Sequence, residues 1–201
     1  MIYPAWQIKL SAAADEQALA AQGCGVLLRR VLAARGCGPD EAQALLGAGE
    51  PLSDPFLMRD MDKAVARMEQ AVENEELIVI YGDYDVDGIT ATCLLTDFLR
   101  RHGADAVSYI PGRLEEGYGL NPIALRQLSS EGVKLIITVD CGITAIAEAQ
   151  LCHQLGIDLV ITDHHECKDK LPLAIAIVDP HKPGDTYPHK NLSGVALAFK
   201  L

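Results

Sequence analysis

Three carboxylates alternate in the stretch YGDYDVDG at residues 81–88, where they occupy Asp83, Asp85 and Asp87. The apolar run 77–80 comes directly before them, so the acids stand where a buried strand would end. At neutral pH such close carboxylates repel one another. Other ligand-type residues also follow apolar runs, namely Asp140, the triplet Asp163-His164-His165, and Asp179 with His181 nearby.

Carboxylates and imidazoles together are ligands for divalent cations such as Mn²⁺, Mg²⁺ or Zn²⁺. Open parallel sheets bind ligands beyond the carboxyl ends of their strands, so residues at several strand ends can meet at one edge. We therefore expect a divalent metal site there. A solvated acidic turn is the alternative for the aspartates, and a pair of surface residues is the alternative for His164 and His165.

The pattern D-x-D-x-D-G also opens a calcium-binding EF-hand loop. That loop needs a helix before it and a glutamate at its twelfth position. Counted from Asp83, the twelfth residue is Leu94, and a strand-like run precedes the acids. The EF-hand interpretation fails on both counts.

The pattern of the chain changes near residue 76. From there, β-rich apolar runs at 77–82, 106–110, 134–140, 157–163 and 173–179 alternate with helical stretches at 89–103, 121–132 and 143–156. This alternation predicts an α/β fold, in which a parallel β-sheet is flanked by helices. Residues 1–75 read as a small N-terminal helical segment, so we expect two parts, 1–75 and 76–201.

Composition limits the classes of function. The 201 residues are 49% hydrophobic and carry a net charge of -11, whereas a protein that grips nucleic acid only through its surface is expected to be basic. Bound cations could instead supply the positive charge. The sequence has neither an apolar run near 18 residues nor a secretory leader, which predicts a cytoplasmic protein. Six cysteines without a C-x-x-C pair indicate reduced thiols, with a zinc site at His153 or His181 as the alternative.

A glycine-rich loop at 110–122 carries two candidate substrate-binding residues, Arg113 and Tyr118. Arginine suits a phosphate, and tyrosine can stack on a base. An ordinary turn without a role in binding is the alternative for this loop.

The motifs GDYDVDG, VDCG and TDHH, in this order, resemble the first three motifs of the DHH phosphoesterase superfamily. Together with LSDPFLMRDMDKAV, IPGRLEEGYGL and YPHKNLSGVALAFKL, they make the chain from about residue 25 onward closely similar to the RecJ family. The resemblance implies hydrolysis of phosphodiesters with Mn²⁺ or Mg²⁺, acting from the 5′ end of single-stranded DNA in bacterial repair and recombination. It also implies a single-strand-binding protein and a RecQ-type helicase as partners.

The same resemblance assigns roles to individual residues. Asp85, Asp87 and His164 match metal ligands, and Asp140 matches a ligand that can bridge two ions. Asp83 belongs to the RecJ form of the motif and is a further candidate ligand.

The remaining roles concern the substrate and its chemistry. His165 would face the phosphate, and Asp163 would orient the two histidines. Two cations would activate a water for attack, with His165 or Arg113 stabilising the charge that develops on the phosphate. The expected catalytic residues are therefore His165, Asp140 and Arg113.

Two departures from the family pattern stand out. Tyr81 occupies a position where many relatives carry a histidine ligand, and the aspartate of a fourth motif is not found. The sequence stops within an amphipathic helix that begins at Ser193, so we expect a fragment with weak activity or none. The alternatives are a DHH phosphatase for short oligonucleotides or cyclic dinucleotides, and a non-catalytic DHH scaffold.

Overall fold

The computed structural model of the chain describes residues 13–47, 52–112 and 117–201. By contacts the chain divides into two units, which we call the helical unit (Met1–Leu52) and the sheet unit (Ser53–Leu201). Each has its own hydrophobic core. The predicted loop residue Arg113 lies outside the described residues.

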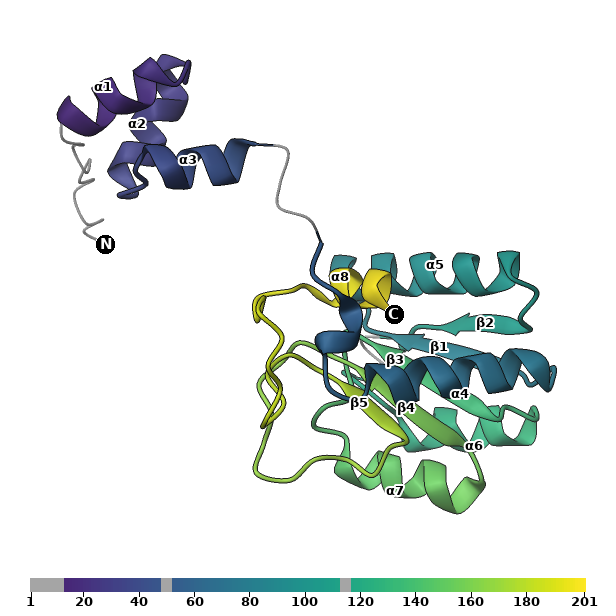
Figure 1. Cartoon of the computed structure of the whole chain (residues 1–201). Helices are drawn as coiled ribbons and strands as arrows, with labels where there is room; N and C mark the ends of the chain where they lie inside the picture. The colour runs from purple at the N-terminus through teal and green to yellow at the C-terminus, as the bar shows by residue number, and fades with distance from the viewer. Residues whose placement is uncertain (1–12, 48–51, 113–116) are drawn as a thin grey trace, which may run out of the picture. The chain divides into compact units, whose positions relative to one another are not determined.

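The described residues of the helical unit form three short helices, α1 (Ala13–Ala21), α2 (Val26–Ala34) and α3 (Pro39–Leu46) (Figure 1). Pro39 is the first residue of α3, and the N–H of Gly38 donates to the Glu41 side chain, which are both common features of a helix start. A small core closes the unit, made of Leu19, Leu32, Ala33 and Ala42.

Five parallel strands form the sheet, in the order β2-β1-β3-β4-β5. Their bounds are Ile78–Gly82 (β1), Ala106–Tyr109 (β2), Leu135–Val139 (β3), Asp158–Thr162 (β4) and Ala176–Val178 (β5). β1 and β3 are buried along their whole length, as continuous apolar runs predict. The predicted α/β fold is confirmed. The order in which the strands are added reverses direction between β1 and β3, and open sheets bind ligands at such a switch point.

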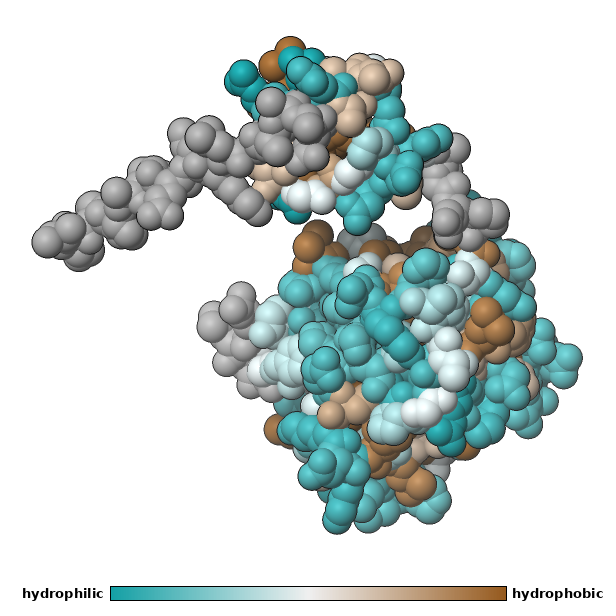
Figure 2. Space-filling view, turned by 60° about the vertical axis from the view of Figure 1, so that its left-hand side comes forward, coloured by the Kyte–Doolittle hydropathy of each residue, from teal (hydrophilic) through white to brown (hydrophobic). Residues whose placement is uncertain are grey.

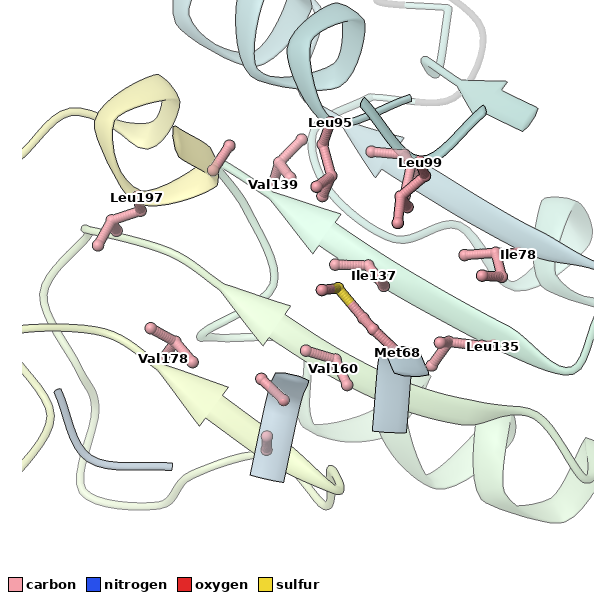
Figure 3. Close-up of a cluster of buried hydrophobic side chains, with 14 of the residues drawn as sticks. Met68, Ile78, Leu95, Leu99, Leu135, Ile137, Val139, Val160, Val178 and Leu197 are labelled. Carbon is pink, nitrogen blue, oxygen red and sulfur yellow. The ribbon is translucent and has the colours of Figure 1, made fainter. Parts of the chain in front are cut away.

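Helices cover both faces of the sheet (Figure 1). One face carries α4 (Met61–Glu73), α5 (Val86–Arg101) and α8 (Gly194–Lys200), and the other carries α6 (Pro122–Ser130) and α7 (Ile146–Leu155). Figure 3 shows side chains of the first face, with Leu95 and Leu99 from α5, Met68 from α4 and Leu197 from α8 packed over the strands. Burial of such side chains is the main term that holds the layers together.

Residues 53–75 belong to the sheet unit. They contain the short 3-10 helix η1 (Pro55–Leu57) and α4, whose Met61 and Met68 enter the core. The buried Arg67 of α4 donates to Asp158 at 2.6 Å and to Glu76 at 2.6 Å, which ties α4 to the starts of two strands. The boundary between two parts of the chain at residues 75 and 76 stays a prediction.

The surface and the cysteines complete the description. Figure 2 shows a largely hydrophilic face of the sheet unit with scattered apolar residues. No helix within the described ranges has both the length and the apolar character needed to cross a membrane. All six cysteines are free thiols; Cys141 and Cys152 are buried and Cys93 is exposed.

Candidate metal centre

Four aspartates form a row along the carboxyl edge of the sheet. Gly82 pairs with Val139, Val139 with Thr162, and Thr162 with Val178, so the next residue of each strand falls in the same register. Those residues are Asp83, Asp140, Asp163 and Asp179, and all four are at most 5% exposed. The register of a parallel sheet therefore gathers acids that lie up to 96 positions apart in the sequence, counted from residue 83 to residue 179.

Glycines close the turn between β1 and α5. A Cβ on Gly82 would overlap the hydroxyl of Thr92, and a Cβ on Gly88 would lie 2.5–2.8 Å from the backbone of Asp83. The strand end and the helix start can approach this closely only without those side chains. Asp85 then caps α5, since its Oδ1 accepts from the N–H groups of Asp87 at 2.8 Å and Gly88 at 3.1 Å.

Asp140 occupies the centre of the row. Its φ is 61°, a left-handed backbone conformation that is unusual for a residue with a side chain. Its Oδ1 is buried and has no hydrogen-bond partner; it lies 2.9 Å from Nε2 of His164 without hydrogen-bond alignment. Burial, and then the charges of Asp87 and Asp85, raise the pKa of Asp140 to about 7.

Asp163 binds the two residues that follow it. Its Oδ1 accepts from the backbone N–H of His164 at 2.8 Å and from Nδ1 of His165 at 2.7 Å, while its Oδ2 accepts from the N–H of Ile143 at 2.9 Å. Burial alone would raise the pKa of Asp163, but these hydrogen bonds outweigh it and lower the pKa. The bond to Asp163 raises the pKa of His165 to about 9, so His165 is cationic at neutral pH.

Ligand-type atoms gather into two groups that share Asp140. One group is Asp83, Asp85 and Asp140, and the other is Asp140, His164 and His165; within each group the atoms lie within 4.8 Å of one another. The buried Oδ1 of Asp83 has no hydrogen-bond partner, and burial raises the pKa of Asp83, with the Asp85 charge as a smaller cause.

These residues fit a divalent cation. No lysine or arginine in the described part of the chain forms an ion pair with the carboxylates of the two groups. Buried carboxylate oxygens without donors are stabilised by a proton or by a nearby positive charge, and carboxylate with imidazole is a donor set that divalent cations accept.

Asp87 is held differently from the other candidate ligands. Its Oδ2 accepts from the N–H of Gly194 at 2.7 Å, and its Oδ1 accepts from the N–H of Val195 at 2.7 Å, both in the first turn of α8. Nε2 of His164 lies 3.7 Å from its Oδ2. Asp87 is therefore next to the centre, with both oxygens already accepting one hydrogen bond each.

The glycine-rich loop reaches the same edge. Tyr118 is half exposed, its hydroxyl lies 3.4 Å from the carbonyl oxygen of Asp140, and its ring meets His165 edge-on at 6.2 Å between centroids. Tyr81 is buried and donates from its hydroxyl to the Gly119 carbonyl at 3.1 Å. Tyr81 thus fixes the loop that carries Tyr118.

The strand-end residues Asp179 and His181 do not join the two groups. Asp179 accepts from the backbone N–H of His181 at 2.7 Å, which closes the turn after β5. No cysteine and no His153 belongs to a ligand group among the described residues, so the alternative of a zinc site gains no support.

Two sets of hydrogen-bond donors at the centre were not predicted from the sequence. They are the backbone N–H groups of α8 that hold Asp87, and the N–H of Ile143 that holds Asp163. Backbone donors leave no mark in residue types. The only available signals were Ser193 and Gly194 at a helix start and the glycine before Ile143.

Comparison with known proteins gives a family match. The model described as "DHH family, N-terminal domain" matches residues 77–201. A single-stranded-DNA-specific exonuclease RecJ of Bacillus subtilis is 50% identical over 148 residues, which cover 74% of this chain and 19% of that protein. The RecJ of Escherichia coli is 38% identical over 176 residues, which cover 87% of this chain and 30% of that protein.

Solved structures agree with these sequence matches. An exonuclease RecJ bound to manganese aligns with a TM-score of 0.68 and 35% identity, over 75% of this chain and 38% of that one. RecJ of Thermus thermophilus in complex with Mn²⁺ aligns with a TM-score of 0.69 and 27% identity, over 96% of this chain and 27% of that one. The chain spans between 19% and 32% of the length of the curated relatives it matches.

Proposed function

Because this chain belongs to the DHH family, we propose that it forms the metal-binding part of a RecJ-type exonuclease, which hydrolyses phosphodiesters of single-stranded DNA from the 5′ end. The relatives named above are bacterial, so we place this activity in DNA repair and recombination in a bacterial cytoplasm. A single-strand-binding protein and a RecQ-type helicase are the partners proposed with it.

One observation carries the proposal. Two groups of ligand atoms, each within 4.8 Å, share the buried Asp140 at the switch point of a parallel sheet. A shared carboxylate can bridge two cations, and paired cations are the usual means of hydrolysing a phosphodiester. Solved RecJ relatives bind Mn²⁺, and Mn²⁺ or Mg²⁺ is the cofactor proposed here.

The residues divide into ligands and substrate contacts. Asp85, Asp87, Asp140 and His164 would hold the cations, with Asp83 as a further ligand. Bound cations would supply an activated water and Lewis acidity toward the phosphate.

His165 is the proposed contact to the phosphate. Its Nδ1 bonds to Asp163, its side chain is 48% exposed, and the bond to Asp163 raises its pKa, which favours the protonated imidazole. A cationic imidazole that is already oriented can pair with a phosphate oxygen and stabilise added negative charge. Tyr118 is the proposed stacking partner for a base, and Arg113 is proposed as a second phosphate contact.

A two-part experiment tests the function. Calorimetry with Mn²⁺ should show binding to this chain, and Asp140→Ala should remove most of it. The exposed Asp169→Asn serves as the control for loss of one carboxyl.

In the second part, a 5′-labelled single strand is mixed with excess chain and Mn²⁺. Single-turnover conditions are chosen because the chain spans at most 32% of its curated relatives and slow cleavage is expected. Mononucleotides should be released from the 5′ end. Cleavage confined to dinucleotides or cyclic dinucleotides would favour the phosphatase alternative, and absence of Mn²⁺ binding would reject a metal-dependent activity.

A further inference from the structure

We propose that Gly194 is a positioning residue for the metal centre, because it sets the places of two candidate ligands, Asp87 in the first turn of α5 and Asp140 directly after β3. The inference rests on the proposed function, since it concerns the same centre. Gly194 is the first residue of α8, and it touches the centre in two independent ways.

The first contact is through hydrogen bonds to Asp87. The N–H groups of Gly194 and Val195 donate to the two oxygens of that carboxylate, each at 2.7 Å. Two parallel donors fix the plane of a carboxylate as well as its position. Each oxygen keeps a second lone pair, so Asp87 can be oriented by α8 and still face a cation.

The second contact is through the absence of a side chain. A Cβ on Gly194 would lie 2.6 Å from Cβ of Asp140, 2.7 Å from its Cγ and 2.7 Å from its Oδ1. Asp140 is 2% exposed and short, so its side chain has no open space into which it could swing. The side chain of Asp140, the ligand that the two groups share, therefore occupies the space that a side chain at position 194 would need.

The rest of α8 anchors this residue to the core. The Ser193 hydroxyl accepts from the N–H of Ala196 at 3.3 Å, which caps the first turn. Leu197 is fully buried in the cluster shown in Figure 3, together with Val139 and Val178. A small shift of α8 would therefore move Asp87 and Asp140 together, since one residue contacts both.

Substitution Gly194→Ala tests the inference. The added methyl must displace either Asp140 or α8, and we expect Mn²⁺ affinity in calorimetry to fall at least 10-fold. The spectrum of bound Mn²⁺ in electron paramagnetic resonance should change as well, because the ligand geometry changes.

Two controls separate positioning from general loss of structure. Gly38→Ala places the same methyl at another helix start, where no atom lies within 4 Å, and should leave Mn²⁺ affinity unchanged. Leu197→Ala weakens the packing of α8 without touching either ligand. It should lower the urea midpoint while its folded form binds Mn²⁺ within threefold of the parent chain. A Leu197→Ala loss as large as that of Gly194→Ala would overturn the proposal.

A measurement on the unsubstituted chain covers the case in which Gly194→Ala does not fold. Titration with Mg²⁺ should shift the amide proton resonances of Gly194 and Val195 saturably, because Asp87 then shares its charge between α8 and the cation. Saturable Mg²⁺ binding without movement of these two resonances would overturn the inference while leaving the proposed function intact. Absence of Mn²⁺ and Mg²⁺ binding to the parent chain would overturn both.

Discussion

Replacement of Asp179 by asparagine should make the protein more stable, and the gain should grow with pH. Asp179 is fully buried at the end of β5, and its single backbone donor, the N–H of His181, can also bond to the oxygen of an asparagine. Burial, opposed by that hydrogen bond and reinforced by the charge of Asp163, raises the pKa of Asp179 from 3.8 to about 7. The folded protein therefore favours the neutral carboxyl.

The size of the effect follows from proton linkage. Between pH 4 and 7 the unfolded chain has released this proton while the folded chain still holds it, so folding becomes less favourable as pH rises through that window. At about 1.36 kcal/mol per pH unit, the full cost above pH 7 is about 4 kcal/mol. Of this, about 2 kcal/mol should appear between pH 5.5 and pH 8.5. Asparagine has no proton to release and does not bear this cost.

Urea unfolding of both proteins at pH 5.5, 7.0 and 8.5 measures the difference. The advantage of Asp179→Asn should rise up to pH 7 and then stay constant. Asp169→Asn, an exposed aspartate of the same β4–β5 connection, is the matched control. An equal gain in the control would assign the effect to net charge. A difference that does not change with pH, or a parent protein that is the more stable at pH 8.5, would refute the buried neutral carboxyl.

Three other predictions concern the centre and its supports. His165→Ala should reduce release of mononucleotides at least 10-fold more than it reduces Mn²⁺ affinity, whereas His164→Ala should reduce both; equal affinity losses in calorimetry would contradict this division. Arg67→Met leaves two carboxylates without their cation and should lower the free energy of unfolding by about 2–3 kcal/mol, measured in urea. A loss below about 0.5 kcal/mol would show that these ion pairs stabilise the fold no more than exposed ion pairs do. Tyr81→Phe removes a buried donor to the Gly119 carbonyl and should cost about 1–2 kcal/mol, with faster amide exchange in residues 117–121; unchanged exchange would show that the loop does not depend on this bond.

The fold was predictable because its signals are local. Four of the five strands are followed directly by an aspartate, and the residues between the first four strands have helical periodicity with recognisable caps such as Asn121 before Pro122. The association of α4 with the sheet was not predictable. The apolar side chains of α4 can pack on any apolar surface, and the contact of Arg67 with Asp158, which lies 91 positions away, is a pairing that the residue types do not encode.

The centre was predictable to the extent that strand ends are. Asp83, Asp140 and Asp163 come directly after apolar runs, and parallel register alone places them in one row. The position of Asp87 was not predictable, because its partners are backbone N–H groups 107 and 108 positions away. Asp179 shows the converse, since it stands in the same row but joins neither ligand group. A position at a strand end brings a residue near the centre. The hydrogen bonds of the following turn then determine whether its side chain joins a ligand group.

The charge of the centre determines the order in which its ligands can enter. Asp83, Asp140 and Asp163 are buried side by side, and the whole chain carries a charge of -11. A phosphodiester brought beside those carboxylates would meet repulsion that the interior screens poorly, and one cationic imidazole at His165 cannot offset it. A divalent cation adds two positive charges at the point where the repulsion is largest. For the proposed exonuclease activity, we therefore expect the cation to bind before the DNA. In such a centre the positive charge that attracts a phosphate belongs to the ion, so the protein does not need a basic surface at this edge.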